Sequence, residues 1–141
     1  MGDDELAAID LSGARTMGLL RAAVGVAMIA APRLVVRPKR GESSGRVEFM
    51  VRTIGVRDLA LGLGTFAAAT ARATRAADAR RWIQFGLLSD ALDTIAGARS
   101  SELLGRGGAA TAALVPIPFV FADIWLLRSR GATRTVEVSR V

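Results

Sequence analysis

Apolar and small residues fill four long stretches of the chain, and short segments rich in arginine, glycine and serine separate them. This pattern is typical of helices that pack side by side. Four helices are predicted, at about 13–31, 47–71, 79–98 and 107–127. Ser12 is a candidate N-cap of the first helix, and Pro32 should end it. Pro116 and Pro118 should kink the fourth.

The third stretch, residues 81–98, carries a stripe of polar and small residues. Gly86, Asp90, Asp93 and Gly97 follow one another at i, i+4, i+7 and i+11, so they share one face of a helix. The rest of this helix is mostly apolar. Two carboxylates framed by glycines on such a helix should face a polar interior, and we expect the other helices to face that stripe.

The predicted helices lack the continuous polar outer face of a soluble bundle. Hydrophobic residues make up 51% of the sequence and the mean hydropathy is +0.36, while most Lys and Arg lie between the apolar runs. Small residues recur at helix-packing spacing, as at Gly18 and Ala22. We therefore expect an all-α fold, an antiparallel four-helix transmembrane bundle with an internal Arg/Asp polar network. A soluble four-helix bundle is the alternative, because the longest uncharged run, Gly107–Ala122, has 16 residues and a span needs about 20.

Net charge and missing residue types narrow the chemistry. The 19 Lys and Arg outnumber the 13 Asp and Glu and give a net charge of +6. They flank apolar runs and do not cluster with aromatic residues, so the expected partner is a lipid bilayer and not nucleic acid. The chain has neither Cys nor His, which excludes disulfides, thiolate sites and His-based catalytic or metal sites. No cofactor or metal is expected.

Both ends of the chain are predicted to lie outside the bundle. Residues 1–12 form an acidic disordered tail without the basic start of a signal peptide, and residues 128–141 form a basic flexible tail. With four spans, the terminal side carries nine basic residues and the other side eight. The dense charge of segment 72–81 favours cytoplasmic termini in a bacterial plasma membrane.

Ionisable residues inside the predicted helices define a candidate polar centre. There are six of them: Arg21, Arg57, Asp58, Asp90, Asp93 and Asp123. In a bilayer such groups are costly, so they should face inward and pair. Helix direction places Arg21 and Asp123 in one layer and Arg57, Asp58 and Asp93 in a second, with Asp90 between the two. A structural role, in which these pairs lock the helix register, is the alternative to a functional one.

The charge balance of this centre is uneven, because two arginines face four aspartates. A dry interior would not hold two surplus negative charges. Either some carboxyls are protonated, or the centre is wet, or it binds a cation or a basic ligand. Asp90 and Asp93 lie on adjacent turns and are the natural pair to share a proton, so they are the candidate catalytic residues for acid–base chemistry.

The segment GVRDLALG, residues 55–62, resembles a family of small four-helix integral membrane proteins of actinobacteria and fungi that are DoxX-like in architecture. The resemblance covers residues 13–127 and is most specific at Gly55, Arg57, Asp58 and Gly62. It implies four transmembrane helices. It implies no established activity, so it bears on architecture and not on function.

Three functions remain open. In the first, the bundle binds or converts a lipophilic small molecule by acid–base chemistry at Asp90 and Asp93, which requires a cavity beside Asp90. In the second, the protein is an accessory or scaffold subunit of a larger membrane complex, with all carboxylates paired and an apolar Gly/Ala face outside. In the third, it is an oligomeric proton-coupled transporter, which requires a polar path across both layers.

Overall fold

A computed structural model describes residues 9–35, 44–71 and 76–129, and within these ranges the chain is all helical, without a strand. The predicted all-α class is confirmed. The helices are α1 (Leu11–Ala30), α2 (Pro32–Val35), α3 (Ser44–Thr70), α4 (Ala76–Arg99), α5 (Ser101–Leu114) and α6 (Ile117–Arg128). Of the predicted tails, residues 1–8 and 130–141 lie outside the described residues. Where the tails are described the prediction is wrong, because Ile9 is buried in the core, α1 already starts at Leu11, and Arg128 is the last residue of α6.

Helix starts differ in detail from the predictions. Asp10, not Ser12, caps α1, and its carboxylate accepts a hydrogen bond of 2.9 Å from the Ser12 backbone N–H. Both residue types are good N-caps, so the sequence alone does not choose between them. Pro32 ends α1 as predicted but also starts the short helix α2, because proline is tolerated in the first turn of a helix.

The predicted fourth helix is two helices. α5 starts at Ser101, earlier than predicted, and ends at Leu114, while α6 starts at Ile117. The interruption lies at Val115 and Pro116, because proline has no N–H to donate to the preceding turn. The Val115 N–H still donates to the Thr111 carbonyl at 3.0 Å, so the chain bends here without unwinding far.

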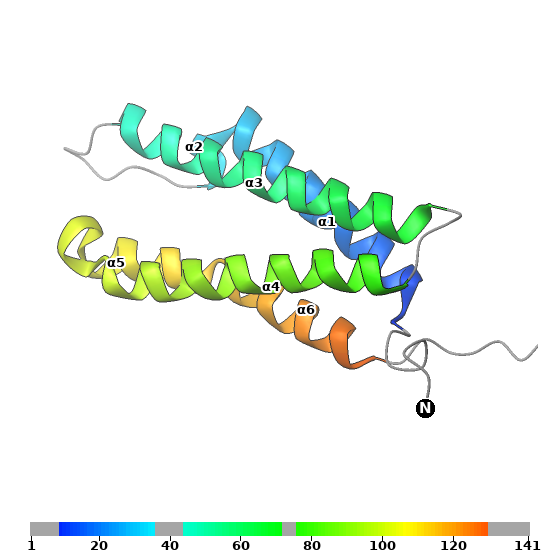
Figure 1. Ribbon diagram of the computed structural model, residues 1–141. Coiled ribbons are helices and arrows are strands. Elements are labelled where there is room, and N and C mark those ends of the chain that lie inside the picture. The colour runs from blue at the N-terminus through cyan, green and yellow to red at the C-terminus, as the bar shows by residue number, and fades with distance from the viewer. Residues whose placement is uncertain (1–8, 36–43, 72–75, 130–141) are drawn as a thin grey trace, which may run out of the picture.

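The helices form two packed groups (Figure 1). α1 and α3 lie side by side and antiparallel, and α4 packs on both α5 and α6. α3 with α4, and α1 with α4 and α6, make the contacts between the groups. Figure 1 shows the two groups close together where α1 begins and α3 ends, and further apart towards α2 and α5.

Glycines allow α1 and α3 to pack backbone to backbone. A Cβ atom on Gly18 would lie 2.8 Å from the Gly62 carbonyl oxygen, and one on Gly25 would lie 2.6 Å from the Gly55 oxygen. The two glycines of α1 are seven residues apart, and so are the two glycines of α3. Glycines of the antiparallel helices therefore meet at two places along the interface. Close approach through small residues is the mode of packing that helices favour in lipid.

Apolar side chains seal the end of the bundle where the two groups meet. We call this the closed end; its buried residues are Ile9, Ala14, Met17, Ala69, Ala79, Ile83 and Leu126. They come from α1, α3, α4 and α6, and Ile9 directly precedes the N-cap of α1. This small core therefore joins both helix groups.

Two helical stretches are long and apolar enough to cross a membrane by length and composition, Leu11–Ala30 with mean hydropathy 1.2 and Gly108–Arg128 with 1.8. The second runs through the break between α5 and α6. Among the described residues, α3 and α4 do not reach this measure. Arg57 and Asp58 in α3, and Asp90 and Asp93 in α4, lower the hydropathy of their central turns. The four-span arrangement is therefore a proposal.

Candidate functional site

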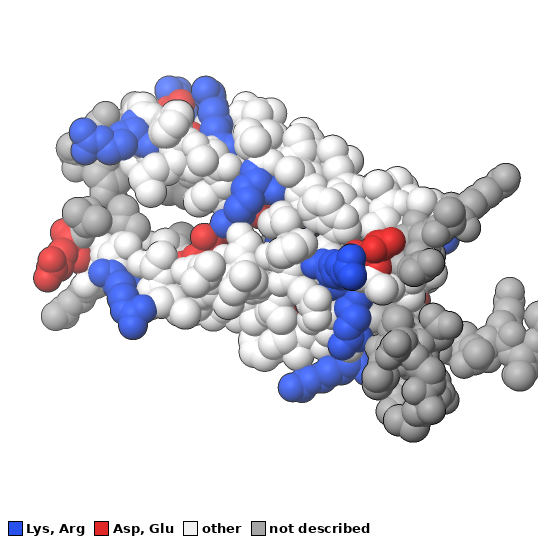
Figure 2. Space-filling view, viewed as in Figure 1, with Lys and Arg blue, Asp and Glu red and all other residues white. Residues whose placement is uncertain are grey.

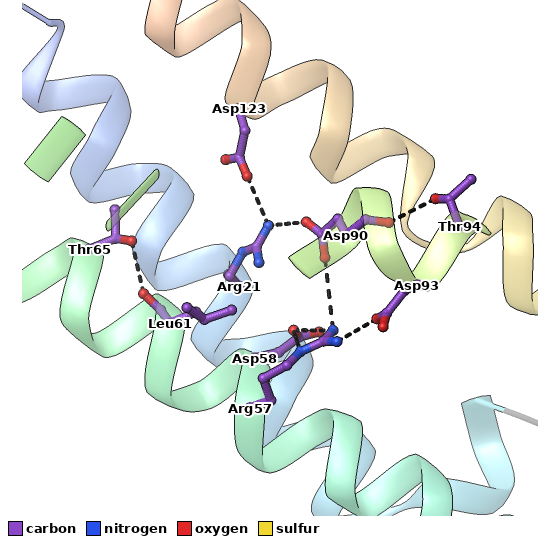
Figure 3. Close-up of polar contacts among 9 residues, drawn as sticks. All are labelled: Arg21, Arg57, Asp58, Leu61, Thr65, Asp90, Asp93, Thr94 and Asp123. Carbon is purple, nitrogen blue, oxygen red and sulfur yellow. Dashed lines mark hydrogen bonds and ion pairs between the residues drawn. The ribbon is translucent and has the colours of Figure 1, made fainter. Parts of the chain in front are cut away.

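The six ionisable residues singled out in the sequence converge in one network at the meeting of the two helix groups (Figure 3). α1 supplies Arg21, α3 supplies Arg57 and Asp58, α4 supplies Asp90 and Asp93, and α6 supplies Asp123. Each residue forms at least one ion pair with another member. The network thus connects four helices.

Arg21 holds the inner part of the network. Its Nη2 atom pairs with Oδ2 of Asp90 and lies 3.1 Å from Oδ2 of Asp123. The guanidinium carbon lies 4.9 Å from the centre of the Phe119 ring, which adds a cation–π contact. The other terminal nitrogen, Nη1, is buried and has no hydrogen-bond partner among the described residues. Arg21 therefore depends on its two carboxylates for compensation of its burial.

Arg57 holds the outer part. Its Nη2 atom lies 2.9 Å from Oδ1 of Asp58, and its Nη1 atom lies 2.5 Å from Oδ2 of Asp93. Asp90 connects the two parts, since its second oxygen lies 3.9 Å from Nη2 of Arg57. These are the pairs that helix direction predicts from the sequence, with Asp90 joined to both layers.

Asp90 and Asp93 do not face each other as a pair. Asp90 is bound mainly by Arg21, and Asp93 by Arg57. Within the described part of the chain no hydrogen bond joins the two carboxyls, so the expectation that they share a proton gains no support from the geometry. Asp90 and Asp93 lie on adjacent turns of α4, so both join the network, but each carboxylate binds mainly a different arginine.

The glycines of the α4 stripe have two different roles. A Cβ on Gly86 would lie 3.0 Å from Oδ2 of Asp123 and 3.2 Å from the guanidinium carbon of Arg21, so Gly86 makes room for the inner ion pairs. A Cβ on Gly97 would lie 2.5 Å from the backbone nitrogen of Ala113, so Gly97 lets α5 approach. Only Gly86 belongs to the site.

Sequence reasoning did not include Phe119 or Thr94 in this centre. Phe119 lies four residues before Asp123, so both belong to one face of α6, and that spacing was the available signal. The Thr94 hydroxyl donates to the Asp90 backbone carbonyl at 2.9 Å. The same i, i+4 spacing places Thr94 beside Asp90 on α4, although a hydroxyl bonded to its own helix gives no distinct sequence pattern.

Exposure rises along the network from one side to the other. The Asp123 and Asp90 side chains are 2% and 3% exposed, whereas those of Asp93 and Arg57 are 30% and 31% exposed. The apolar closed end lies one turn beyond Asp123, at Leu126. Figure 2 shows acidic and basic atoms together in a recess between the two helix groups, on the side away from the closed end. Solvent or a ligand can therefore reach the network from one side.

No family model, no curated protein and no solved structure matches this chain. The family resemblance of residues 55–62 therefore stays a prediction.

Two wide, open hollows in the described structure lie away from the network. One, of about 370 Å³, lies where α1 ends and α3 begins, and the other, of about 350 Å³, lies between the starts of α1 and the end of α6. Neither is lined by Asp90, so they do not supply the cavity that the first functional hypothesis requires. Among the described residues, no three acidic side chains are placed to hold a metal ion.

Proposed function

We propose that this chain is an integral membrane protein whose four long helical stretches, α1, α3, α4 and α5 with α6, cross the bilayer as an antiparallel bundle. The support is the distribution of exposed side chains. Exposed charged residues lie near helix ends. Large apolar side chains are exposed between them, and they include Leu20, Leu63, Phe85, Leu88, Leu92 and Phe121. The blue and red atoms near the middle of Figure 2 mark the place where the network opens between the helix groups.

The length of this apolar surface fits a bilayer. No exposed charge occurs at residues 53–70 of α3 or 82–98 of α4, where the charged residues are those of the network. At about 1.5 Å per residue, these segments extend roughly 25 Å, close to the ~30 Å of a hydrocarbon core. Charged side chains in such a layer must face inward and pair, as these do.

Within this bundle, the network is proposed to bind or convert a lipophilic small molecule at its exposed edge, and not in the cavity beside Asp90 that the sequence led us to expect. The observation that carries this proposal is the one-sided opening at Asp93 and Arg57. A ligand's polar group can replace the contact between Nη1 of Arg57 and Oδ2 of Asp93 while its apolar part stays in lipid. The Asp93 carboxyl then accepts a proton from that polar group or donates one to it. Asp90 contacts both arginines, so its negative charge influences how readily Asp93 gains or loses the proton.

Ligand retention by carboxylate variants tests this proposal. The protein and its Asp93→Asn and Asp90→Asn variants are purified in mild detergent, and organic extracts of each are compared by mass spectrometry. Asp78→Asn is the matched control, because Asp78 is an exposed carboxylate on the same helix. We expect a compound that co-purifies with the wild type and Asp78→Asn and is depleted in the network variants. Equal extracts from folded variants would contradict the proposal.

A scaffold role is the second candidate, and the pairing of the carboxylates favours it. Each of the four network carboxylates has an arginine partner, as expected of a bundle whose ion pairs only fix the helix arrangement. An accessory subunit would be extracted in a stable complex larger than its own detergent-bound monomer or dimer. Light scattering of the gently solubilised protein distinguishes the two functions.

A proton-coupled transporter ranks last. It requires a polar path across both sides of the network. Ile83 and Leu126, both fully buried, lie beyond Asp123 at the closed end, so the described residues offer polar access from one side only.

A further inference from the structure

The hollow of about 370 Å³ where α1 ends lies outside the network and has its own chemistry. We call it the corner pocket; its walls come from the last turn of α1, from α2 and from the first turns of α3, and the residues that matter here are Arg33, Leu34, Glu48 and Arg52. Pockets of a few hundred Å³ accommodate small ligands or parts of larger ones.

Guanidinium groups make the corner pocket positive. Arg33 donates from Nε to Oε1 of Glu48 at 2.7 Å, and no hydrogen bond joins its two terminal nitrogens to a described residue. Arg52 forms no ion pair with a described residue. Among the described residues that line the pocket, two guanidiniums against one carboxylate leave one positive charge. Planar guanidinium donors match phosphate oxygens in geometry.

An apolar edge borders the same pocket. Leu34 is 86% exposed and lines it, and Phe49, which follows Glu48 in α3, is 70% exposed. An exposed apolar side chain and two guanidinium groups therefore line the same hollow. They suit a ligand that carries a phosphate and hydrocarbon chains together.

The position of the pocket along the helices agrees with that ligand. Leu11–Ala30 is one of the two stretches apolar enough to span a membrane, and Ala30 is the first residue that lines the pocket. If α1 crosses the bilayer, the pocket therefore lies where hydrocarbon gives way to headgroups.

We propose that the corner pocket binds the phosphate of an anionic phospholipid, with Arg33 and Arg52 donating to its oxygens and Leu34 against an acyl chain. This rests on the membrane location proposed above. It gives the protein a lipid site separate from the Arg/Asp network, at the opposite side of the α1–α3 pair from the closed end.

Lipid titration of charge-matched variants tests the proposal. The full-length protein in a neutral detergent is titrated with phosphatidylglycerol or phosphatidylcholine, and bound lipid is counted by native mass spectrometry. We expect preference for phosphatidylglycerol and about five-fold weaker binding in Arg52→Gln, since an interfacial arginine contributes roughly 1 kcal/mol. The control is Arg99→Gln, which removes another exposed charge at the end of α4, outside the pocket. It should bind like the wild type.

Several results would overturn the proposal. Equal affinity of Arg52→Gln and Arg99→Gln would mean a general surface attraction, and equal binding of the two lipids would mean no headgroup recognition. Competition by inorganic phosphate alone would assign the pocket to a soluble anion.

If Arg52→Gln does not fold, Glu48→Gln serves instead. This variant removes the carboxylate that pairs with Arg33, so it should strengthen phosphatidylglycerol binding, and weaker binding would contradict the proposal. Failure of the membrane location is separate, because alkaline extraction would then release the wild-type protein.

Discussion

Arg21 lies between the carboxylates of Asp90 and Asp123 and beside the ring of Phe119, so one guanidinium joins α1, α4 and α6. Its importance follows from burial, because all three charged side chains are almost fully enclosed. A buried pair contributes little compared with a well-packed apolar replacement, but loss of one partner leaves the other charge uncompensated.

Replacement of Arg21 by methionine should therefore destabilise the protein strongly, by about 3–5 kcal/mol. Thermal unfolding in detergent measures this as a large fall in Tm. Arg81→Met is the control, since Arg81 is 72% exposed and pairs only loosely with Asp78 at 3.8 Å. A Tm for Arg21→Met equal to that of Arg81→Met would show that the inner ion pairs do not hold the helices together.

Gly86 provides a second test at the scale of one residue. A Cβ there would lie 3.0 Å from Asp123 and 3.2 Å from Arg21, so alanine should displace the ion pair and cost about 1–3 kcal/mol. Gly45, also helical, has nothing within 4 Å of such a Cβ, so Gly45→Ala should be neutral or slightly stabilising. Equal shifts of the unfolding midpoint in the two variants would contradict the packing described for Gly86.

At the scale of elements, the α1–α3 pair depends on glycine contacts. A Cβ on Gly62 would meet the backbone nitrogen of Ala22, and would lie 2.6 Å from the Gly18 carbonyl oxygen. The spacing of Gly18 and Ala22 in the sequence predicted a helix-packing face. In the structure this face of α1 packs against α3. The partner residue could not be predicted, because the register of two antiparallel helices depends on their crossing point.

Gly62→Leu should force α1 and α3 apart and abolish the folded state or lower Tm by well over 10 °C. The larger side chain has backbone atoms against it, which cannot move aside as a flexible side chain can. Ala60→Leu is the control, because Ala60 is exposed on the same helix. Normal unfolding of Gly62→Leu, measured by circular dichroism in detergent, would be incompatible with this interface.

Much of the helix content, but less of the helix boundaries, was predictable from the sequence. Long apolar stretches predict helices whatever their neighbours are. The choice of Asp10 over Ser12 as N-cap, and the start of α2 at Pro32, depend on local geometry that several residues can satisfy. Pro116 and Pro118 both predicted a kink, but only the structure shows that the interruption is at Pro116, with Pro118 inside the first turn of α6.

At the scale of the whole molecule, the composition of the polar centre was predictable and its opening was not. Antiparallel helices fix depth, so Arg21 and Asp123 had to share a layer. The spread of the two helix groups away from the closed end depends on packing of every helix at once. That spread is what exposes Asp93 and Arg57 by about a third, and it decides from which side the network can be reached.

The most direct test of the account is alkaline carbonate extraction of membranes from cells that express the full chain. Buried Arg/Asp pairs behind an apolar outer surface predict that the protein stays in the membrane pellet and is released only by detergent. Release into the supernatant would contradict the account. The network would then be a set of buried ion pairs in a soluble helical bundle, and its exposed apolar side chains would need a protein partner instead of lipid.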